Sequence, residues 1–152
     1  MNTDFEWLFE TRKNISRVVQ NLDLYQLTYI PKGLNNNILW NWGHILVTQQ
    51  LLCHKLAGVD SQLSQDFIDR YRKGSKPEMI ISAQGDLKYI QDNWMTIPLN
   101  TIELHENNQL NNYKDYTTSF GVTLKTINEA IRFNNIHEGL HLGIIMSLKK
   151  LV

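Results

Sequence analysis

Two histidines near the end of the chain have the spacing of a metal-binding pair. They belong to the segment His137-Glu138-Gly139-Leu140-His141. Residues four apart on a helix differ by about 40° in azimuth and by about 6 Å along the axis, so both imidazoles project from one face. Imidazoles held by a rigid helix are common ligands of divalent transition metals. The spacing therefore predicts that His137 and His141 bind one metal ion together.

The residues around this pair favour a buried site. Both histidines continue an apolar stripe that includes Ile131 and Ile144, so we expect them to point into the protein interior. An unpaired buried polar group costs roughly 1 to 3 kcal/mol, and a bound cation would satisfy both rings at once. Histidines on the surface, or core histidines bonded to carbonyl groups, are the alternative for the same spacing.

The segment also matches the H-E-x-x-H signature of zinc peptidases, in which a third ligand lies downstream. After His141 this chain contains only LGIIMSLKKLV, with no His, Asp, Glu or Cys. This disfavours a metallopeptidase and requires the third ligand to come from upstream. Glu138 lies about 100° from His137 around the helix, where it can act as a base, brace a ligand or form a salt bridge.

Three upstream histidines are candidates for the third ligand. His54 lies close to Gly58, a residue type that favours helix ends, where histidines contact the last carbonyl groups. His105 lies in the polar segment ELHENN, where we expect it to be solvated, with a lid residue that reaches the site as the alternative. His44 lies in the middle of ILWNWGHILVTQQLL, on an apolar flank and beside Gly43, which leaves room for a close neighbour. With two potential co-ligands on another core helix, His44 is the predicted third ligand.

Four long segments with helical periodicity are expected to position these residues, at 4–24, 36–57, 77–97 and 122–150. Gly58 is expected to end the second segment and Pro98 the third, and residues 61–75 are expected to hold one short helix. Residues 100–121 are polar and irregular, and we expect a lid or a short hairpin there. The predicted fold class is all-α, a four-helix bundle, with residues 1–152 forming one domain.

The periodicity also predicts the buried face of each helix. Inward residues of the first and third segments are expected to be Phe5, Leu8, Arg12, Ile15, Val19 and Leu22, and Ile80, Ala83, Leu87, Ile90, Trp94 and Ile97. In the connection, Tyr113 and Tyr116 are expected to be surface aromatics, with a pocket mouth as the alternative.

Composition limits the classes of partner and location. Hydrophobic residues make up 42% of the chain and charged residues 20%, as in globular proteins. Fifteen basic residues balance fifteen acidic ones, so no long-range field favours nucleic acid or an anionic membrane. No signal peptide or membrane-spanning stretch is predicted, which favours a cytoplasmic location. The single cysteine, Cys53, excludes an internal disulfide, and its apolar surroundings predict an inert buried thiol.

Two motifs of this chain resemble those of a known family. The first is N-x-x-W-x-x-G-H, formed by Asn37, Trp40, Gly43 and His44, and the second is the C-terminal H-E-G-L-H-L-G. Together they resemble the DinB-like superfamily, and the runs NWGHILVTQQ and HEGLHLGII are similar to its DinB_2 branch. The resemblance extends from the first helix to the last and is specific in these motifs.

The resemblance implies a four-helix bundle, a homodimer and a metal site formed by His44, His137 and His141. Related members include bacillithiol-dependent and other thiol-dependent transferases, so it also implies a small-molecule substrate such as a low-molecular-weight thiol.

Three imidazoles leave at least one coordination position of a metal open, which is typical of catalytic sites. All-nitrogen ligation suits Zn²⁺, Ni²⁺ or Fe²⁺ about equally. The open position can activate water or hold a thiol as its thiolate. Three hypotheses follow: a metal-dependent transferase or hydrolase, an H-E-x-x-H metallopeptidase, and a non-enzymatic bundle whose metal serves stability or sensing, or whose histidines bind none.

Overall fold

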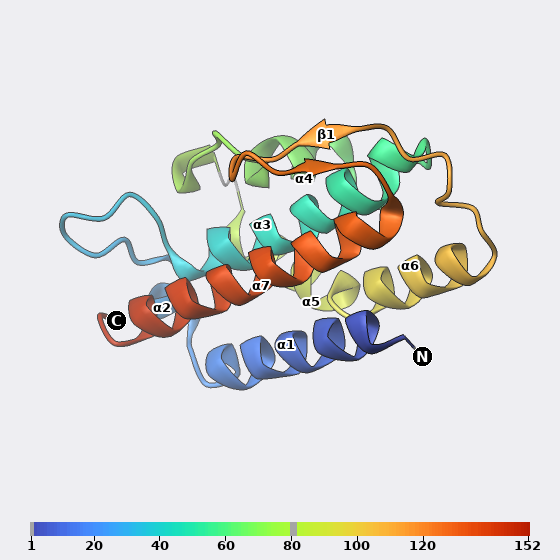
Figure 1. Cartoon of the computed structure of the whole chain (residues 1–152). Coiled ribbons are helices and arrows are strands. Elements are labelled where there is room, and N and C mark those ends of the chain that lie inside the picture. The colour runs from blue at the N-terminus through green and yellow to red at the C-terminus, as the bar shows by residue number, and fades with distance from the viewer. Residues whose placement is uncertain (1, 80–81) are drawn as a thin grey trace.

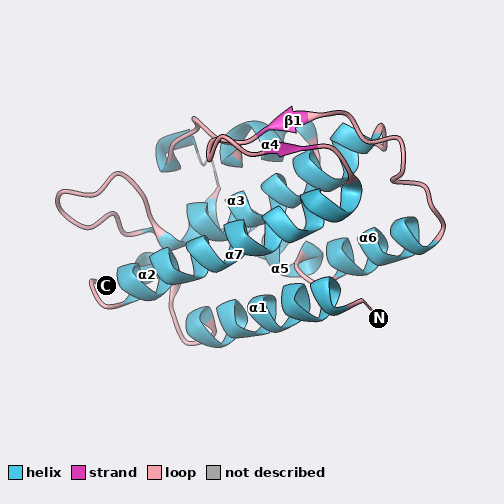
Figure 2. Ribbon diagram, in the orientation of Figure 1, coloured by secondary structure: helices cyan, strands magenta, loops and turns pink. Residues whose placement is uncertain are grey.

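Helices account for nearly all the regular structure in the computed structural model, which describes residues 2–79 and 82–152 (Figures 1 and 2). The α-helices are α1 (Thr3–Val19), α2 (Leu24–Thr28), α3 (Ile38–Gln49), α4 (Gln65–Tyr71), α5 (Ala83–Asn93), α6 (Thr96–Glu106) and α7 (Ile127–Lys149). Shorter elements are the π-helix η1 (Gln50–His54), the 3-10 turns η2 (Lys55–Ala57) and η3 (Pro77–Met79), and the antiparallel strands β1 (Tyr116–Thr117) and β2 (Thr123–Leu124). The predicted all-α class is confirmed.

Helix α7 packs against both α1 and α3. In Figure 1, α1 and α7 run in the same direction. Asn41 on α3 contacts His141 on α7. His44, one turn after Asn41 on α3, contacts His137, which lies one turn before His141 on α7. The two helices are therefore antiparallel. One turn of α3, from Asn41 to His44, therefore faces one turn of α7, from His137 to His141.

Side-chain caps set where the two histidine-bearing helices begin. The Asn37 Oδ1 accepts a hydrogen bond from the Trp40 N–H at 2.8 Å, which caps α3. The Thr126 Oγ1 accepts from the Glu129 N–H at 3.2 Å, and the Glu129 carboxylate accepts from the Lys125 N–H at 2.7 Å. Such caps satisfy backbone donors that the first helical turn leaves unpaired.

Several boundaries differ from the sequence-based expectations. Helix α1 ends at Val19, about one turn early, and the strand β2 occupies the first turn predicted for the last helix. The second predicted helix is present as α3, η1 and η2, and it ends at Gly58 as expected, with φ +77°. Only a residue without a Cβ adopts this left-handed conformation at low cost.

The third predicted helix is divided into η3, α5 and α6. Pro98 does not end it but lies at the third position of α6, because a proline in the first turn of a helix sacrifices no intrahelical hydrogen bond. Helix α6 then continues to Glu106, so the expectation that residues 100–121 are wholly irregular is wrong. A short hairpin, one of the two expectations for residues 100–121, is formed by β1 and β2, and its second strand lies just beyond that range.

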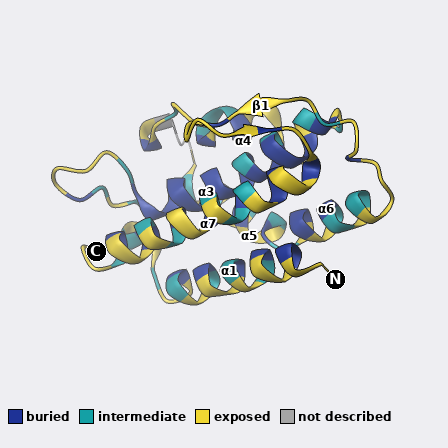
Figure 3. Cartoon of the chain, in the orientation of Figure 1, coloured by how far each residue is buried: buried dark blue, intermediate teal, exposed yellow. Residues whose placement is uncertain are grey.

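Buried side chains line the inner face of each long helix (Figure 3). Phe5, Leu8, Ile15, Val19 and the charged Arg12 are buried, as predicted. In the third segment Ile90, Trp94 and Ile97 are buried and Ala83 and Leu87 are half-buried, whereas Ile80 lies outside the described residues. Cys53 is a buried free thiol whose pKa is raised to about 12, chiefly by burial and further by the Glu138 carboxylate. Within residues 2–79 and 82–152, no helix combines the length and apolarity needed to cross a membrane.

Candidate metal centre

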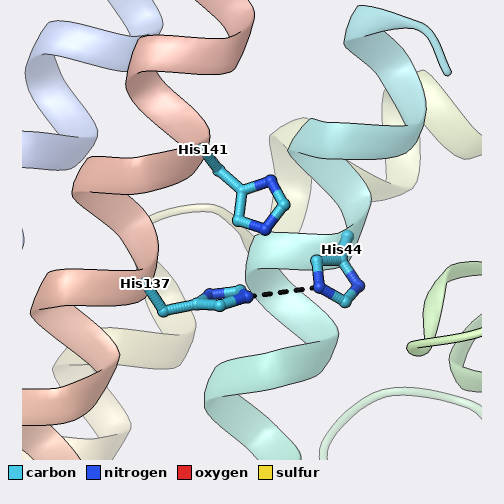
Figure 4. Close-up of side chains that lie close together, drawn as sticks. All are labelled: His44, His137 and His141. Atoms are coloured by element: carbon cyan, nitrogen blue, oxygen red, sulfur yellow. Dashed lines mark hydrogen bonds between the residues drawn. The ribbon is translucent and has the colours of Figure 1, made fainter. Parts of the chain in front are cut away.

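The three predicted histidines converge between α3 and α7. Figure 4 shows His44 projecting from α3 toward His137 and His141, which come from α7. Each ring offers one nitrogen atom, and these three atoms lie within 4.8 Å of one another. The Nε2 atoms of His44 and His137 are 3.2 Å apart. Tetrahedral zinc with Zn–N bonds of 2.0–2.1 Å separates its ligand nitrogens by about 3.3 Å, so this spacing fits a shared cation.

Hydrogen bonds on the outer side of two rings fix which nitrogen faces the centre. The Nδ1 of His44 lies 2.7 Å from the Tyr71 carbonyl oxygen, which can only accept. The Nδ1 of His141 lies 2.7 Å from the Oδ1 of Asn41, whose Nδ2 is already engaged as a donor to the Asn37 carbonyl. Both Nδ1 atoms therefore carry the proton, and both Nε2 atoms keep a lone pair for the centre.

The remaining contacts of the centre involve His137 and Thr48. The Thr48 hydroxyl lies 3.2 Å from the His44 Nε2, to which it donates. The Nδ1 of His137 is buried and has no hydrogen-bond partner among the described residues. Its ring therefore lacks the outer anchor that the other two rings have, and its orientation depends on what its Nε2 contacts.

Burial keeps these imidazoles neutral, which is the form that binds metals. Burial lowers the pKa of His137 to about 2, and the neighbouring His141 and His44 lower it further as like charges. Burial also lowers the pKa of His141 to about 4, with a smaller contribution from His44. The pKa of His44 is lowered by burial against the opposing hydrogen bond to the Tyr71 carbonyl. No proton needs to leave the rings before a cation binds at neutral pH.

The motif around His44 has a structural role at each of its positions. Asn37 caps the helix, and the Trp40 indole stacks on the His44 ring with centroids 4.6 Å apart and planes inclined by 11°. Gly43 lies under the aromatic ring of Tyr71, which occupies the space that a Cβ would need. The same packing of Tyr71 against α3 brings its carbonyl within 2.7 Å of the His44 Nδ1.

A comparison with known protein families matches residues 8–145 to the DinB superfamily. The match includes all of α3, most of α1 and most of α7 with both of its histidines. The chain belongs to the DinB superfamily. A comparison with curated proteins returned no match.

In this DinB protein, Glu138 is fully buried and forms an ion pair with Arg12, which is also fully buried. The Arg12 Nη2 and Nε donate to the two carboxylate oxygens at 2.9 and 3.1 Å, and the Asn134 amide donates to Oε1 at 2.9 Å. Arg12 also donates to Gln49 on α3 and to the Trp94 carbonyl. Of the three roles that the sequence left open for Glu138, the salt bridge is the one observed.

A pocket of about 250 Å³ opens beside the DinB centre, and His44 and His137 form part of its wall. The other lining residues are Thr48, Leu51, Leu52, Lys55, Leu56, Lys73, Tyr116, Thr118, Ser119 and Phe133. The β1–β2 hairpin thus contributes to the pocket. Tyr116, for which a pocket mouth was the alternative to a plain surface position, is one of its lining residues. Tyr113 is half-buried and does not line the pocket.

The other two histidines of the DinB chain lie outside this group. His54 does not contact helix-end carbonyls through its ring but is fully buried, with its Nε2 2.9 Å from the Thr101 Oγ1 and its Nδ1 3.4 Å from the Gln50 amide. His105 is half-buried instead of fully solvated, and its Nε2 lies 2.8 Å from the Asn128 Oδ1.

Sequence reasoning missed the residues that orient the centre and line its pocket. Asn41 lies one turn before His44 on the same helix, so its spacing was a usable signal. Tyr71 and Lys73 carry no local signal, because the packing of α4 against α3 is what brings Tyr71 to the His44 ring and Lys73 to the pocket.

Proposed function

We propose that this protein is a metal-dependent enzyme that transfers a low-molecular-weight thiol to an electrophile, with His44, His137 and His141 holding one divalent cation. The observation that carries the proposal is the convergence of three neutral imidazoles at the wall of an open pocket. A divalent cation held there would lower the pKa of a thiol or water and so supply a nucleophile near neutral pH.

The protein's own residues would orient and enclose the reactants. Tyr71 and Asn41 hold two of the imidazoles in the tautomer whose Nε2 faces the centre. The Thr48 hydroxyl lies at the pocket wall within reach of the same point and can accept or donate a hydrogen bond there. The apolar side chains of Leu51, Leu52 and Phe133 limit the access of water.

The transfer balances without a redox partner. The thiol loses its proton to solvent, and its sulfur forms a bond to an electrophilic carbon of the second substrate. The bond from that carbon to its leaving group breaks, and the leaving group departs with the electron pair. Hydrolysis, with water in place of the thiol, is the other reaction that the same centre would support.

A peptidase mechanism is disfavoured by the position of Glu138. In H-E-x-x-H peptidases this glutamate acts as the general base beside the metal. Here both of its oxygens accept hydrogen bonds from Arg12 in the protein core, and Glu138 does not line the pocket. A base must reach the proton that it removes.

Metal binding by single histidine variants tests the centre. We expect the purified protein to bind one Zn²⁺ or Ni²⁺ per chain, and His44→Ala, His137→Ala and His141→Ala each to weaken binding by more than about 100-fold. His105→Ala is the matched control and should bind as the unaltered protein does. Unchanged affinity in His44→Ala, measured by competition with a chromophoric chelator, would show that the three-histidine centre is wrong.

Activity tests the reaction class. The metal-loaded protein should accelerate the reaction of a small thiol with an aryl halide, and removal of the metal by a chelator should abolish that acceleration. A protein that binds metal through all three histidines but accelerates neither this reaction nor ester hydrolysis would instead be a non-enzymatic metal protein.

A further inference from the structure

The pocket beside the metal centre has a marked charge asymmetry. Two lysines, Lys55 and Lys73, line it, and its lining contains no aspartate or glutamate. Within residues 2–79 and 82–152, neither lysine lies within 4.0 Å of a carboxylate. The chain as a whole has no net charge, so this concentration of positive charge is local to the pocket. A bound divalent cation would add to it, since the three imidazoles are neutral.

The two lysines are joined to the centre by different lengths of chain. Lys73 follows Tyr71 by two residues, a span of at most about 7 Å, and the Tyr71 carbonyl is 2.7 Å from the His44 ring. Lys55 lies eleven residues after His44, which is about 16 Å along a helix, and helical side chains lean back toward the N-terminus. Leu51, Leu52 and Leu56 supply an apolar wall along the pocket.

We infer that the substrate of this pocket carries an anionic oxygen group, such as a carboxylate or sulfonate, joined through an apolar body to the end that binds the metal. This inference rests on the proposed function, because it assumes that the metal-binding end is a thiol. Lys55, toward the end of the pocket away from the centre, binds the anionic group, and Lys73, closer to the centre, adds to the positive potential along the pocket. Tyr116, Thr118 and Ser119 from the hairpin offer further hydroxyl donors.

The test uses three six-carbon thiols of similar length whose far ends are anionic, neutral and cationic: mercaptohexanoate, mercaptohexanol and aminohexanethiol. Each is titrated into the cobalt-loaded protein, and its dissociation constant is taken from the thiolate-to-cobalt absorption band. We expect mercaptohexanoate to bind about tenfold more tightly than mercaptohexanol, and aminohexanethiol to bind most weakly. A hexane sulfonate thiol, used as a fourth ligand, shows whether the site prefers carboxylate to sulfonate.

Variants assign the preference to the two lysines. The double variant Lys55→Gln/Lys73→Gln should bind cobalt unchanged but lose the preference for mercaptohexanoate. Lys76→Gln, also an exposed lysine but outside the pocket lining, removes one positive charge and should keep the preference. Equal affinity for the three thiols in the unaltered protein, or a preference retained in the double variant, would overturn the inference and leave the proposed function standing. Cobalt binding without any thiol absorption band would instead contradict the proposed thiol chemistry.

Discussion

Asn41 and His141 lie on different helices, and the Asn41 Oδ1 accepts a 2.7 Å hydrogen bond from the His141 Nδ1. Asn41 is almost fully buried, so water does not readily replace this bond. The contact ties α3 to α7 at the point where the metal centre is formed. It also decides which nitrogen of His141 is available to a cation.

Removal of this acceptor should weaken metal binding without removing a ligand. We expect Asn41→Ala to lower the affinity for Zn²⁺ by about 10- to 100-fold, because the His141 ring loses its orientation and tautomer preference. Asn41→Asp keeps an acceptor at the same position and should retain most of the affinity. Asn14→Ala, on the exposed side of α1, is the control for asparagine loss. Equal affinities in Asn41→Ala and the unaltered protein would show that the bond does not support the centre.

Two helical glycines should respond oppositely to the same substitution. Gly43→Ala places a methyl group against the Tyr71 ring, so we expect a loss of about 1–3 kcal/mol in the free energy of unfolding and weaker metal binding. Gly139 lies in α7, and a Cβ there meets no atom within 4 Å from other parts of the described chain, so Gly139→Ala should gain about 0.5–1 kcal/mol. Urea denaturation of both variants measures this. Equal changes in the two would contradict the close approach of Tyr71 to α3.

The buried ion pair between Arg12 and Glu138 should matter for stability and not for the chemistry. Glu138→Gln leaves the Arg12 charge uncompensated in the core, and we expect a loss of about 3–5 kcal/mol in the free energy of unfolding. Lys88→Gln breaks an exposed pair with Asp92 and should change stability by less than about 0.5 kcal/mol.

A double variant tests the same ion pair if Glu138→Gln does not fold. The double variant Arg12→Met/Glu138→Leu removes both charges and should be more stable than either single change. Either folded variant should still bind metal. Normal stability of Glu138→Gln together with a complete loss of activity would instead assign Glu138 a catalytic role.

His54 should make the metal-free protein less stable in mild acid. Burial lowers its pKa from 6.5 to about 4, so between these values the unfolded chain binds a proton that the folded protein excludes. The stabilisation is present above the unfolded pKa and is lost as the pH falls. Between about pH 7.5 and 5 this amounts to about 2 kcal/mol. The His54→Gln variant has no titratable group at this position. Over the same pH range, its free energy of unfolding should therefore fall by about 2 kcal/mol less than that of the unaltered protein. Parallel pH profiles would show that His54 does not contribute.

Local patterns predicted the long helices α1, α3 and α7 and the three histidines of the candidate centre. The i, i+4 spacing of His137 and His141 placed both rings on one face of a helix. Because no ligand follows His141, the third ligand was predicted upstream, at His44. The same periodicity placed Arg12 on a buried face without naming its partner. Glu138 is 126 positions away, and no pattern within either helix indicates the pair.

The sequence by itself determined an all-α fold and the residues of the candidate centre, because helical periodicity and ligand spacing are properties of a single helix. Only the tertiary structure decided the division of the third predicted helix, the ion pair of Glu138, and the roles of Tyr71, Asn41, Lys55 and Lys73. These depend on which helices pack together and in what register. A side chain's partner across an interface is set by that register, whereas its own helix fixes only the direction in which it points.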